Sequence, residues 1–506
     1  FFFNYEKFIK IEKKFQDNPL IIKIYNLGFR SLSIIENQLD FSRVFYKLKE
    51  QEPDNLNINM SAEDYANLMS QIEFFKKKTF IKDEYNYWRK AKLFDKKEKY
   101  NIEYKLHGTS VTPLHRGFFN LRIKFNKKEK FLNNQRQFNL IKLYQQSDEK
   151  ISTIIINNIA NDIGLLSPRG ELILVKINNV NLGLFYKQER HSKEWFEKQK
   201  ITNYSLLKNN DDWDKKYHGH FSDLDLHEQN IEISGESNNS PLALGSLKIL
   251  FKAIRSNDLE TIFKLIDVDD FAKFIALLSV FNNPHMISGD NLKFVYDHSQ
   301  GSFKVLFRIE SDISTINTDL GDFNKSLFFE DNILTQELFK ILIEDSDFRN
   351  QRDKYLQKII NKRLEIIEEA NKFYEEGYKY IMFSNLAVSH QNHLKKMFFK
   401  TFDHNLQKIT EYLSYAKIYV SQEKKDGSIQ LSIINDSYVP IKLKSIKLKN
   451  KDQFNENYLL PSIKLNENLN YYDNKIFLIS SNHEINQIEF ENSITKKKNK
   501  QRSHLY

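Results

Sequence analysis

The spacing of apolar residues changes along the chain, and each change predicts a different kind of element. In Ala62–Lys78, apolar side chains recur about every third or fourth residue, which predicts a helix. A second helix is predicted over Ser152–Leu165. Alternation of apolar and polar residues predicts strands in Asn101–Leu106 and Phe119–Phe125. Two further strand-like segments, Leu172–Asn178 and Asn181–Gln188, predict a hairpin. This order predicts a sheet with one packed helix, typical of the α+β class.

The second half of the chain is first helical and then β-rich. A polar run, Asn209–Pro241, predicts a long surface loop. Alternation returns in Lys417–Leu448 and in Tyr458–Phe490, which predicts a small β-sandwich. Between the polar run and the predicted sandwich, amphipathic segments predict helices: Leu242–Asn257, Leu259–Leu265, Asp267–Val280, Leu334–Ile343 and Asp353–Tyr380.

These patterns predict a chain of several parts. We expect an N-terminal α/β extension in 1–100, a β-rich lobe in 101–208, a helical lobe with a hairpin and long helices in 209–415, a β-sandwich in 416–492 and a basic disordered tail in 493–506. The length of 506 residues leaves ample chain to bury a core in each larger part.

Composition narrows the chemistry only in places. The chain contains no cysteine, which excludes disulfides, thiolate metal sites and cysteine nucleophiles. The net charge of +9 comes from lysines spread along the whole length, which suits phosphorylated ligands or anionic surfaces but does not indicate specific nucleic-acid binding. No apolar run approaches the ~20 residues that cross a bilayer. Because the chain begins with Phe1, membrane association through a signal peptide or anchor outside this chain is compatible with it.

Polar groups interrupt two apolar runs between Phe281 and Asp312. A polar loop ends in Asp290 and Asn291, a strand and a turn at Gly301 follow, and Glu310 and Asp312 come after a second strand. Magnesium requires oxygen ligands that converge from separate backbone segments, and a hairpin with these side chains at its ends supplies them. The alternative is a polar surface loop joined to an ordinary hairpin.

The segment Phe119–Phe125 carries two cations on one face. By strand alternation, Leu121, Ile123 and Phe125 pack inward, while Arg122 and Lys124 point to the opposite side. A lysine in this position can neutralise nucleotide phosphates. The alternative is a solvated lysine on an edge strand.

Several short segments, in order, resemble one protein family. The segments are a predicted helix ending in Trp88–Leu93, then Tyr104–Ser110, His115–Phe125, Arg136–Leu140, Gly164–Arg169, Ile177–Glu189, Asp267–Phe281, and His285 with Asn291. Their order resembles the spore-coat protein H (CotH) kinase-like family, in its divergent bacterial members, over about Tyr65 to Asp312.

The resemblance implies an atypical protein-kinase-like fold of two lobes that uses ATP and Mg2+. Lys124 falls at the family's nucleotide-binding lysine, with Arg122 beside it on the same face. Glu189 matches the acid that ends the family's hairpin, where it could orient Lys124 or meet the nucleotide. Asn291 matches a metal-binding amide, and Asp290 beside it is the candidate base or second ligand.

The chain also departs from the family pattern. The family's Trp-Asp or Tyr-Asp pair, whose acid binds metal, falls on Arg308 and Ile309 here, so Glu310 lies one residue late and Asp312 three. Asp290 replaces the histidine that commonly precedes the loop asparagine. A transfer enzyme without its acids loses transition-state stabilisation, which would leave a pseudokinase.

Two hypotheses remain open. The first is an enzyme that transfers phosphoryl groups from ATP to Ser or Thr of a protein partner, with Lys124, Arg122 and Glu189 at the nucleotide, Asn291, Glu310 and Asp312 at the metal, and Asp290 as base. The second is a catalytically impaired scaffold or binding protein of the cell envelope or surface, with the C-terminal sandwich as its binding module. The family's secretory members imply an extracytoplasmic location for either.

Overall fold

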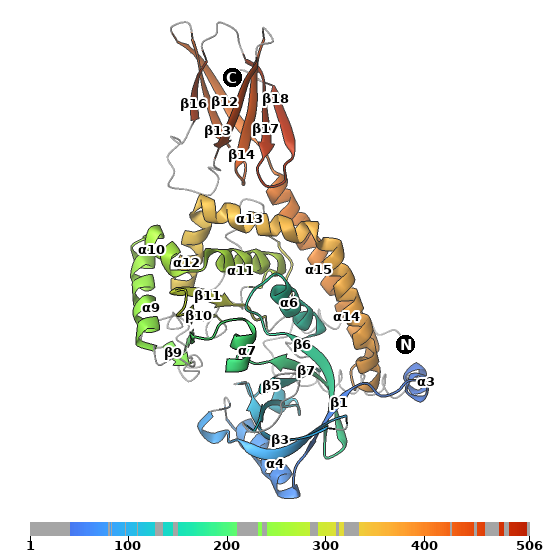
Figure 1. The fold of residues 1–506 in the computed structure, drawn as a ribbon. Helices are drawn as coiled ribbons and strands as arrows, with labels where there is room; N and C mark the ends of the chain where they lie inside the picture. Colours follow the sequence, from blue (N-terminus) through green and yellow to red (C-terminus); the bar gives the residue numbers. More distant parts are fainter. Residues whose placement is uncertain are drawn as a thin grey trace.

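The protein is a mixed α/β chain built in three tiers. In Figure 1 a barrel lies at the bottom, a group of helices in the middle, and a pair of sheets from the C-terminal part of the chain at the top. The computed structural model describes residues 41–78, 81, 83–96, 98–108, 110–126, 135–144, 150–209, 231–234, 240–283, 292–309, 313–317, 333–425, 428–449, 453–460, 475–479 and 485–502.

The lower tier is a closed barrel with the strand order β1-β2-β3-β4-β5-β7-β6. Neighbouring strands are antiparallel except β1 and β6, which pair in parallel and close the barrel. The strands are β1 (Asn55–Asn59), β2 (Arg89–Asp95), β3 (Glu98–His107), β4 (Asn120–Phe125), β5 (Gln137–Lys142), β6 (Gly170–Ile177) and β7 (Val180–Glu189).

Alternation along β4 fills the barrel as the sequence predicts. Leu121, Ile123 and Phe125 are fully buried in the barrel core. Helix α4 (Ala62–Lys76) packs Leu68 and Phe75 into the same core, and the Ser61 side chain caps its first turn by accepting a hydrogen bond from the Asp64 backbone N–H at 3.0 Å.

The prediction of a helix ending in Trp88–Leu93 is wrong. Residues Arg89–Asp95 form β2, whose backbone pairs with β1 on one side and β3 on the other. Hydrogen bonds to two neighbours override the weak helical preference of a short Lys- and Ala-containing segment. The barrel therefore includes strands from the first hundred residues.

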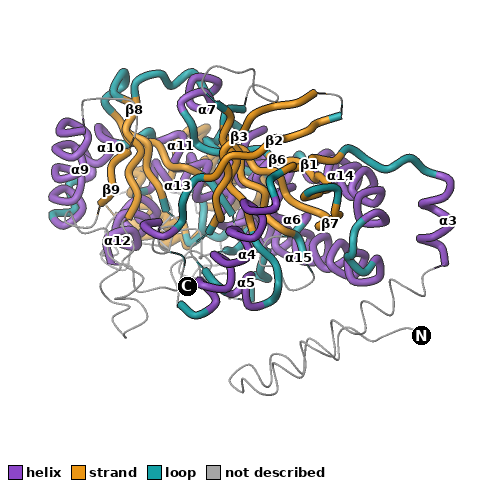
Figure 2. The backbone as a smooth tube through the Cα atoms, turned by 90° about the horizontal axis from the view of Figure 1, so that it is seen from below, coloured by secondary structure: helices purple, strands orange, loops and turns teal. Residues whose placement is uncertain are grey.

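The middle tier, which we call the helical body, packs onto the outside of β5, β6 and β7. Helix α6 (Ile151–Asp162) shares a core with Ile141, Leu184 and Tyr186, which face away from the barrel interior. Viewed from below in Figure 2, α9, α10 and α12 lie on one side of the strands and α3 and α14 on the other. Short helices η1 (Asp83–Tyr85), α5 (Thr112–His115) and α7 (Lys193–Lys198) lie between the strands in sequence.

The long helices differ from the prediction in two ways: one predicted helix is divided in two, and one observed helix was not predicted. The single predicted helix Asp353–Tyr380 is two helices that divide at Lys362, because α13 packs on α11 while α14 runs along β6. Helix α15 was not predicted. The helices are α3 (Phe41–Lys49), α9 (Ser240–Arg255), α10 (Leu259–Leu265), α11 (Val268–Phe281), α12 (Ile333–Glu344), α13 (Ser346–Asn361), α14 (Arg363–Phe383) and α15 (Val388–Ser414).

A second sheet belongs to the helical body. Its order is β11-β10-β8-β9, with the β10–β11 hairpin turning at Gly301 as predicted. Strand β9 lies inside the segment that we predicted as a surface loop. The strands are β8 (Tyr204–Asn209), β9 (Ile231–Ser234), β10 (Lys293–Asp297) and β11 (Ser302–Leu306).

The upper tier consists of two antiparallel sheets, β12-β13-β16 and β15-β14-β17-β18, which share one apolar core. Part of the tail that we predicted to be disordered forms β18, paired with β17. The strands are β12 (Ile418–Lys425), β13 (Ser428–Asn435), β14 (Ile441–Leu448), β15 (Gln453–Leu460), β16 (Lys475–Ile479), β17 (Ile485–Asn492) and β18 (Lys498–Arg502).

Candidate functional site

Cations line the outer face of β3 and β4, which turns away from the barrel core. Arg122 lies opposite Lys105, and Lys124 lies opposite Glu103. Because directly paired residues in antiparallel strands point to the same side, these side chains share one face. The Arg122–Asn139 pair continues this face onto β5, where Ile141, two residues further along, packs against the helical body. The cation-bearing face is therefore the one that borders the helical body.

Arg122 lies in a cluster of cations where the barrel meets the β10–β11 hairpin. Its Nη2 is 3.2 Å from Nδ1 of His107. Burial lowers the pKa of His107 well below its ordinary value, and the charges of four cations lower it further: Arg122, Arg308, Arg190 and Lys293. We call these four side chains the junction cluster.

Three separate segments contribute to the junction cluster. Arg122 comes from β4, Arg190 directly follows β7, and Lys293 and Arg308 lie at the open ends of the β10–β11 hairpin. His191, next to Arg190, responds in the same way: burial and the charges of Lys293, Arg308 and Arg190 lower its pKa well below the ordinary value. Positive charge gathered from three segments suits an anion at this junction.

The segment after β11 is held at the same junction by α6. The side chain of Asn157, which is fully buried, accepts a hydrogen bond from the Ile309 backbone N–H at 3.0 Å and donates one to the Ile309 carbonyl at 3.2 Å. Two hydrogen bonds to one residue fix the backbone beside Arg308. The position of this cation therefore depends on α6 as well as on the hairpin.

The predicted metal and base residues lie outside the described residues. This applies to Asp290, Asn291, Glu310 and Asp312. Within the described ranges, no group of three or more His, Asp or Glu side chains is placed to hold a metal ion. Those four assignments stay predictions.

Lys124 lies on the predicted face and has local partners. Its Nζ is 3.2 Å from Oε2 of Glu103 and 5.2 Å from the centre of the Trp88 ring. It also lines an open pocket on the outer face of β2 and β3. The structure thus pairs Lys124 with Glu103 and not with Glu189, which corrects the expectation that Glu189 orients it.

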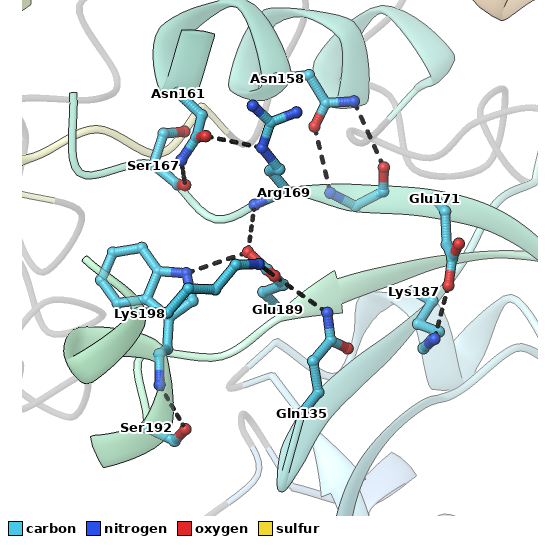
Figure 3. A network of polar contacts seen from close by, with 12 residues as sticks. Gln135, Asn158, Asn161, Ser167, Arg169, Glu171, Lys187, Glu189, Ser192 and Lys198 are labelled. Atoms are coloured by element: carbon cyan, nitrogen blue, oxygen red, sulfur yellow. Dashed lines mark hydrogen bonds and ion pairs between the residues drawn. The ribbon is translucent and has the colours of Figure 1, made fainter. Parts of the chain in front are cut away.

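Glu189 is the centre of a different network at the end of β7 (Figure 3). It pairs with Phe138, a barrel-core residue, and so faces away from Lys124. Its carboxylate is 5% exposed. It accepts hydrogen bonds from four groups: the Gln135 side chain at 3.1 Å, the Arg169 backbone N–H at 3.0 Å, the Trp195 indole at 3.1 Å and the Lys198 ammonium at 2.9 Å.

The network fixes the start of β6 and the position of α7 relative to β7. Arg169 precedes β6, whereas Trp195 and Lys198 belong to α7. Arg169 also contacts α6, where its Nε donates to Asn161 at 2.7 Å (Figure 3). A buried carboxylate that accepts four hydrogen bonds holds these segments firmly together.

Sequence reasoning missed three members of the junction cluster and His107. Arg308 was visible only as part of the Arg308–Ile309 pair that replaces the family's aromatic–acid pair, which we interpreted as the loss of a metal ligand and not as a gain of positive charge. Nothing in the local pattern of Lys293 or Arg190 distinguishes either from a solvated cation. Only the approach of β4 to the hairpin brings them together.

The family model described as CotH kinase protein matches residues 105–420, more than half of the chain. The chain belongs to the CotH family. The match begins inside β3 and ends inside β12, so it contains β4, the junction cluster and Glu189 and omits β1, β2 and most of the C-terminal sheets. A search among curated proteins found no match.

Among the described helices of this CotH family member, none has the length and hydropathy required to cross a membrane.

Proposed function

We propose that this chain is a CotH-like atypical kinase that binds ATP between the barrel and the β10–β11 hairpin. The barrel corresponds to the nucleotide lobe of a kinase-like arrangement, and the helical body to the second lobe. The junction cluster is the observation that carries the proposal, because four cations around one point offset the charge of a triphosphate.

Each candidate residue has a distinct role in this proposal. Arg122 and Lys124, two residues apart on the same face of β4, both face the phosphates. Glu189 acts as a positioning residue that holds α7 and the segment before β6 in place. Asn291, Glu310 and Asp312 supply the oxygen ligands that Mg2+ prefers, and the ion offsets phosphate charge when bound.

The proposed reaction is transfer of the γ-phosphoryl group to a hydroxyl of Ser or Thr on a protein partner. The hydroxyl oxygen forms a bond to the γ-phosphorus, the bond from that phosphorus to the bridging oxygen of ADP breaks, and the hydroxyl proton passes to the carboxylate of Asp290. The family's secretory members support an extracytoplasmic, cell-envelope partner.

One observation favours a second candidate function. Ile309 occupies the position where the family pattern places its metal-binding acid, and Arg308, in place of the preceding aromatic residue, contributes positive charge. An apolar residue in place of the acid, with a cation beside it, favours nucleotide or anion binding over metal-assisted transfer. A pseudokinase that acts as an envelope scaffold is therefore the alternative.

Thermal unfolding with and without ATP and Mg2+ tests the binding step. A ligand at 100 times its dissociation constant stabilises the fold by about 2.7 kcal/mol, and we expect the parent protein to show a rise in Tm. Arg122→Ala should abolish most of this rise. Arg363→Ala, which removes an exposed arginine paired with Asp403 on α15, is the matched control and should keep it. An unchanged Tm in the parent at millimolar ATP overturns the proposal.

A turnover assay with γ-labelled ATP separates the two functions. Phosphoryl transfer or hydrolysis that falls in Asp290→Asn, while ATP binding is retained, supports the kinase. Binding of ATP with no turnover in the parent supports the scaffold.

A further inference from the structure

The outer face of β2 and β3 carries a pocket that shares only Lys124 with the proposed nucleotide site. Its volume is about 1050 Å³, at the upper end of the range for small-molecule sites and large enough for several residues of a polypeptide. We call it the lysine pocket. It is lined by Asn59, Met60, Ser61, Lys90, Ala91, Lys92, Phe94, Lys99, Asn101, Ile102, Glu103, Lys124, Phe125 and Asn126.

Charge in the lysine pocket is unbalanced. Four of the lining residues are lysines and one, Glu103, is an acid. Glu103 is already paired with Lys124 at 3.2 Å. The ammonium groups of Lys90, Lys92 and Lys99 make no hydrogen bond or ion pair with any residue that the structure describes. Three uncompensated cations in one concave site attract an anionic ligand.

The lysines are spaced for an extended chain. Lys90 and Lys92 point to the same side of β2 and so lie about 7 Å apart, twice the rise per strand residue. Lys99 belongs to the adjacent strand, where it pairs with Phe94. Alternate side chains of an extended polypeptide repeat at the same interval of about 7 Å. Successive carboxylates on one side of such a ligand can therefore meet successive lysines.

The other lining groups favour a polypeptide over a nucleic acid. No arginine is among the described residues that line the pocket, although arginine is the side chain that binds phosphate with two parallel hydrogen bonds. The aromatic rings offer no platform for bases, because Phe125 is fully buried in the barrel core and Phe94 is half-buried. Amide side chains also line the pocket, and Oδ1 of Asn59 is buried without a donor among the described residues. Backbone N–H groups of a peptide supply such donors, and phosphates do not.

We propose that the lysine pocket binds an extended polypeptide segment rich in Asp and Glu. Binding itself does not require nucleotide. The further statement that this segment belongs to the phosphoryl acceptor rests on the proposed function, since the pocket and the junction cluster share one face of β3 and β4.

Fluorescence anisotropy with a labelled oligoglutamate, in the absence of nucleotide, tests the proposal. Lys90→Gln/Lys92→Gln removes the charge of two pocket lysines without reversing it. Lys442→Gln/Lys444→Gln is the matched control, because these lysines are also two residues apart on one strand, β14 of the C-terminal sheets. A neutral Ser/Gln peptide and an oligothymidine of the same length are the ligand controls.

We expect oligoglutamate to bind the parent and the β14 control equally, and to bind Lys90→Gln/Lys92→Gln at least tenfold more weakly. The affinity should fall as salt rises, because exposed charges are screened. Equal affinity of the parent and Lys90→Gln/Lys92→Gln overturns the proposal, and so does tighter binding of oligothymidine than of oligoglutamate. The pocket variant keeps the junction cluster, so its Tm rise with ATP reports on the proposed function separately.

Discussion

Two charged regions lie on opposite faces of the barrel sheet, and they use charge differently. At the end of β7, the Glu189 carboxylate is buried and accepts four hydrogen bonds from the surrounding chain. On the other face, Arg122, Arg190, Lys293 and Arg308 gather around His107 with the same sign of charge.

Glu189 is a charge that stabilises the fold, whereas we propose that the charges of the junction cluster bind a ligand. The fold compensates Glu189 with its own donors, so a ligand would have to displace them. The junction cluster concentrates positive charge from three segments, which suits an anionic ligand. A family motif that includes both residues does not reveal this difference.

The largest expected effect is on stability, from Glu189→Ala. Removing one partner of a buried charged network costs about 3–5 kcal/mol, because the remaining donors lose their acceptor. Urea unfolding measures the loss. Glu197→Ala, which removes a half-exposed acid of α7, the helix that Glu189 holds in place, should cost less than about 1 kcal/mol. If Glu189→Ala keeps full stability but loses ATP binding, Glu189 is a ligand-binding residue and the contrast fails.

The next effect is on affinity, from Arg308→Ala. We expect ATP to bind at least tenfold more weakly, which corresponds to about 1.4 kcal/mol, because one cation of the junction cluster is lost from the hairpin side. Titration calorimetry measures the dissociation constant. Lys304→Ala, on the same hairpin but paired with Asp267, is the control and should leave the affinity unchanged. Wild-type affinity in Arg308→Ala would show that the hairpin does not contribute to the site.

A smaller effect concerns pH. Burial and then Arg122 hold the pKa of His107 below its unfolded value, so the folded protein binds fewer protons and loses stability as pH falls below about 6.5. Arg122→Ala removes one positive neighbour, so the pKa of His107 should rise and the acid-side loss should shrink. Unfolding free energies at several pH values between 5 and 7 measure this. A steeper loss of unfolding free energy with falling pH in Arg122→Ala would contradict the predicted direction of the change in the His107 pKa.

The smallest expected effect comes from Glu103→Gln. The Lys124–Glu103 pair is about one-third exposed on both sides, so breaking it should cost no more than about 1 kcal/mol of stability. The change removes the one acid among the lining residues of the lysine pocket. Oligoglutamate should therefore bind more tightly, as anisotropy will show. Weaker binding would mean that Glu103 contacts the ligand.

The sequence predicted local geometry better than the meeting of distant segments. Alternation in Phe119–Phe125 placed Arg122 and Lys124 on the correct face, because a strand with one buried side has a fixed register. The same reasoning failed for β2, whose pattern of Lys and Ala gives little periodicity and whose state depends on its neighbours. The break at Lys362 was missed because the amphipathic pattern continues through it without a proline or glycine.

The candidate site was predictable only in part. Strand alternation pointed to Arg122, but Lys293 and Arg308 join it through the approach of a hairpin that lies far away in sequence. Glu189 was identified by its place in a motif, whereas its role depends on donors from α7, from the start of β6 and from the residues before β5. Such contacts follow from tertiary packing, which no local pattern encodes.

Binding of ATP at the junction cluster is most directly tested by the NMR signal of His107. With selectively labelled histidine, the account predicts that ATP with Mg2+ shifts the His107 resonance and raises its pKa, because phosphate charge stabilises the imidazolium. His393 on α15 should stay unchanged as the internal reference. ATP binding that leaves both the resonance and the pKa of His107 unmoved would contradict the account.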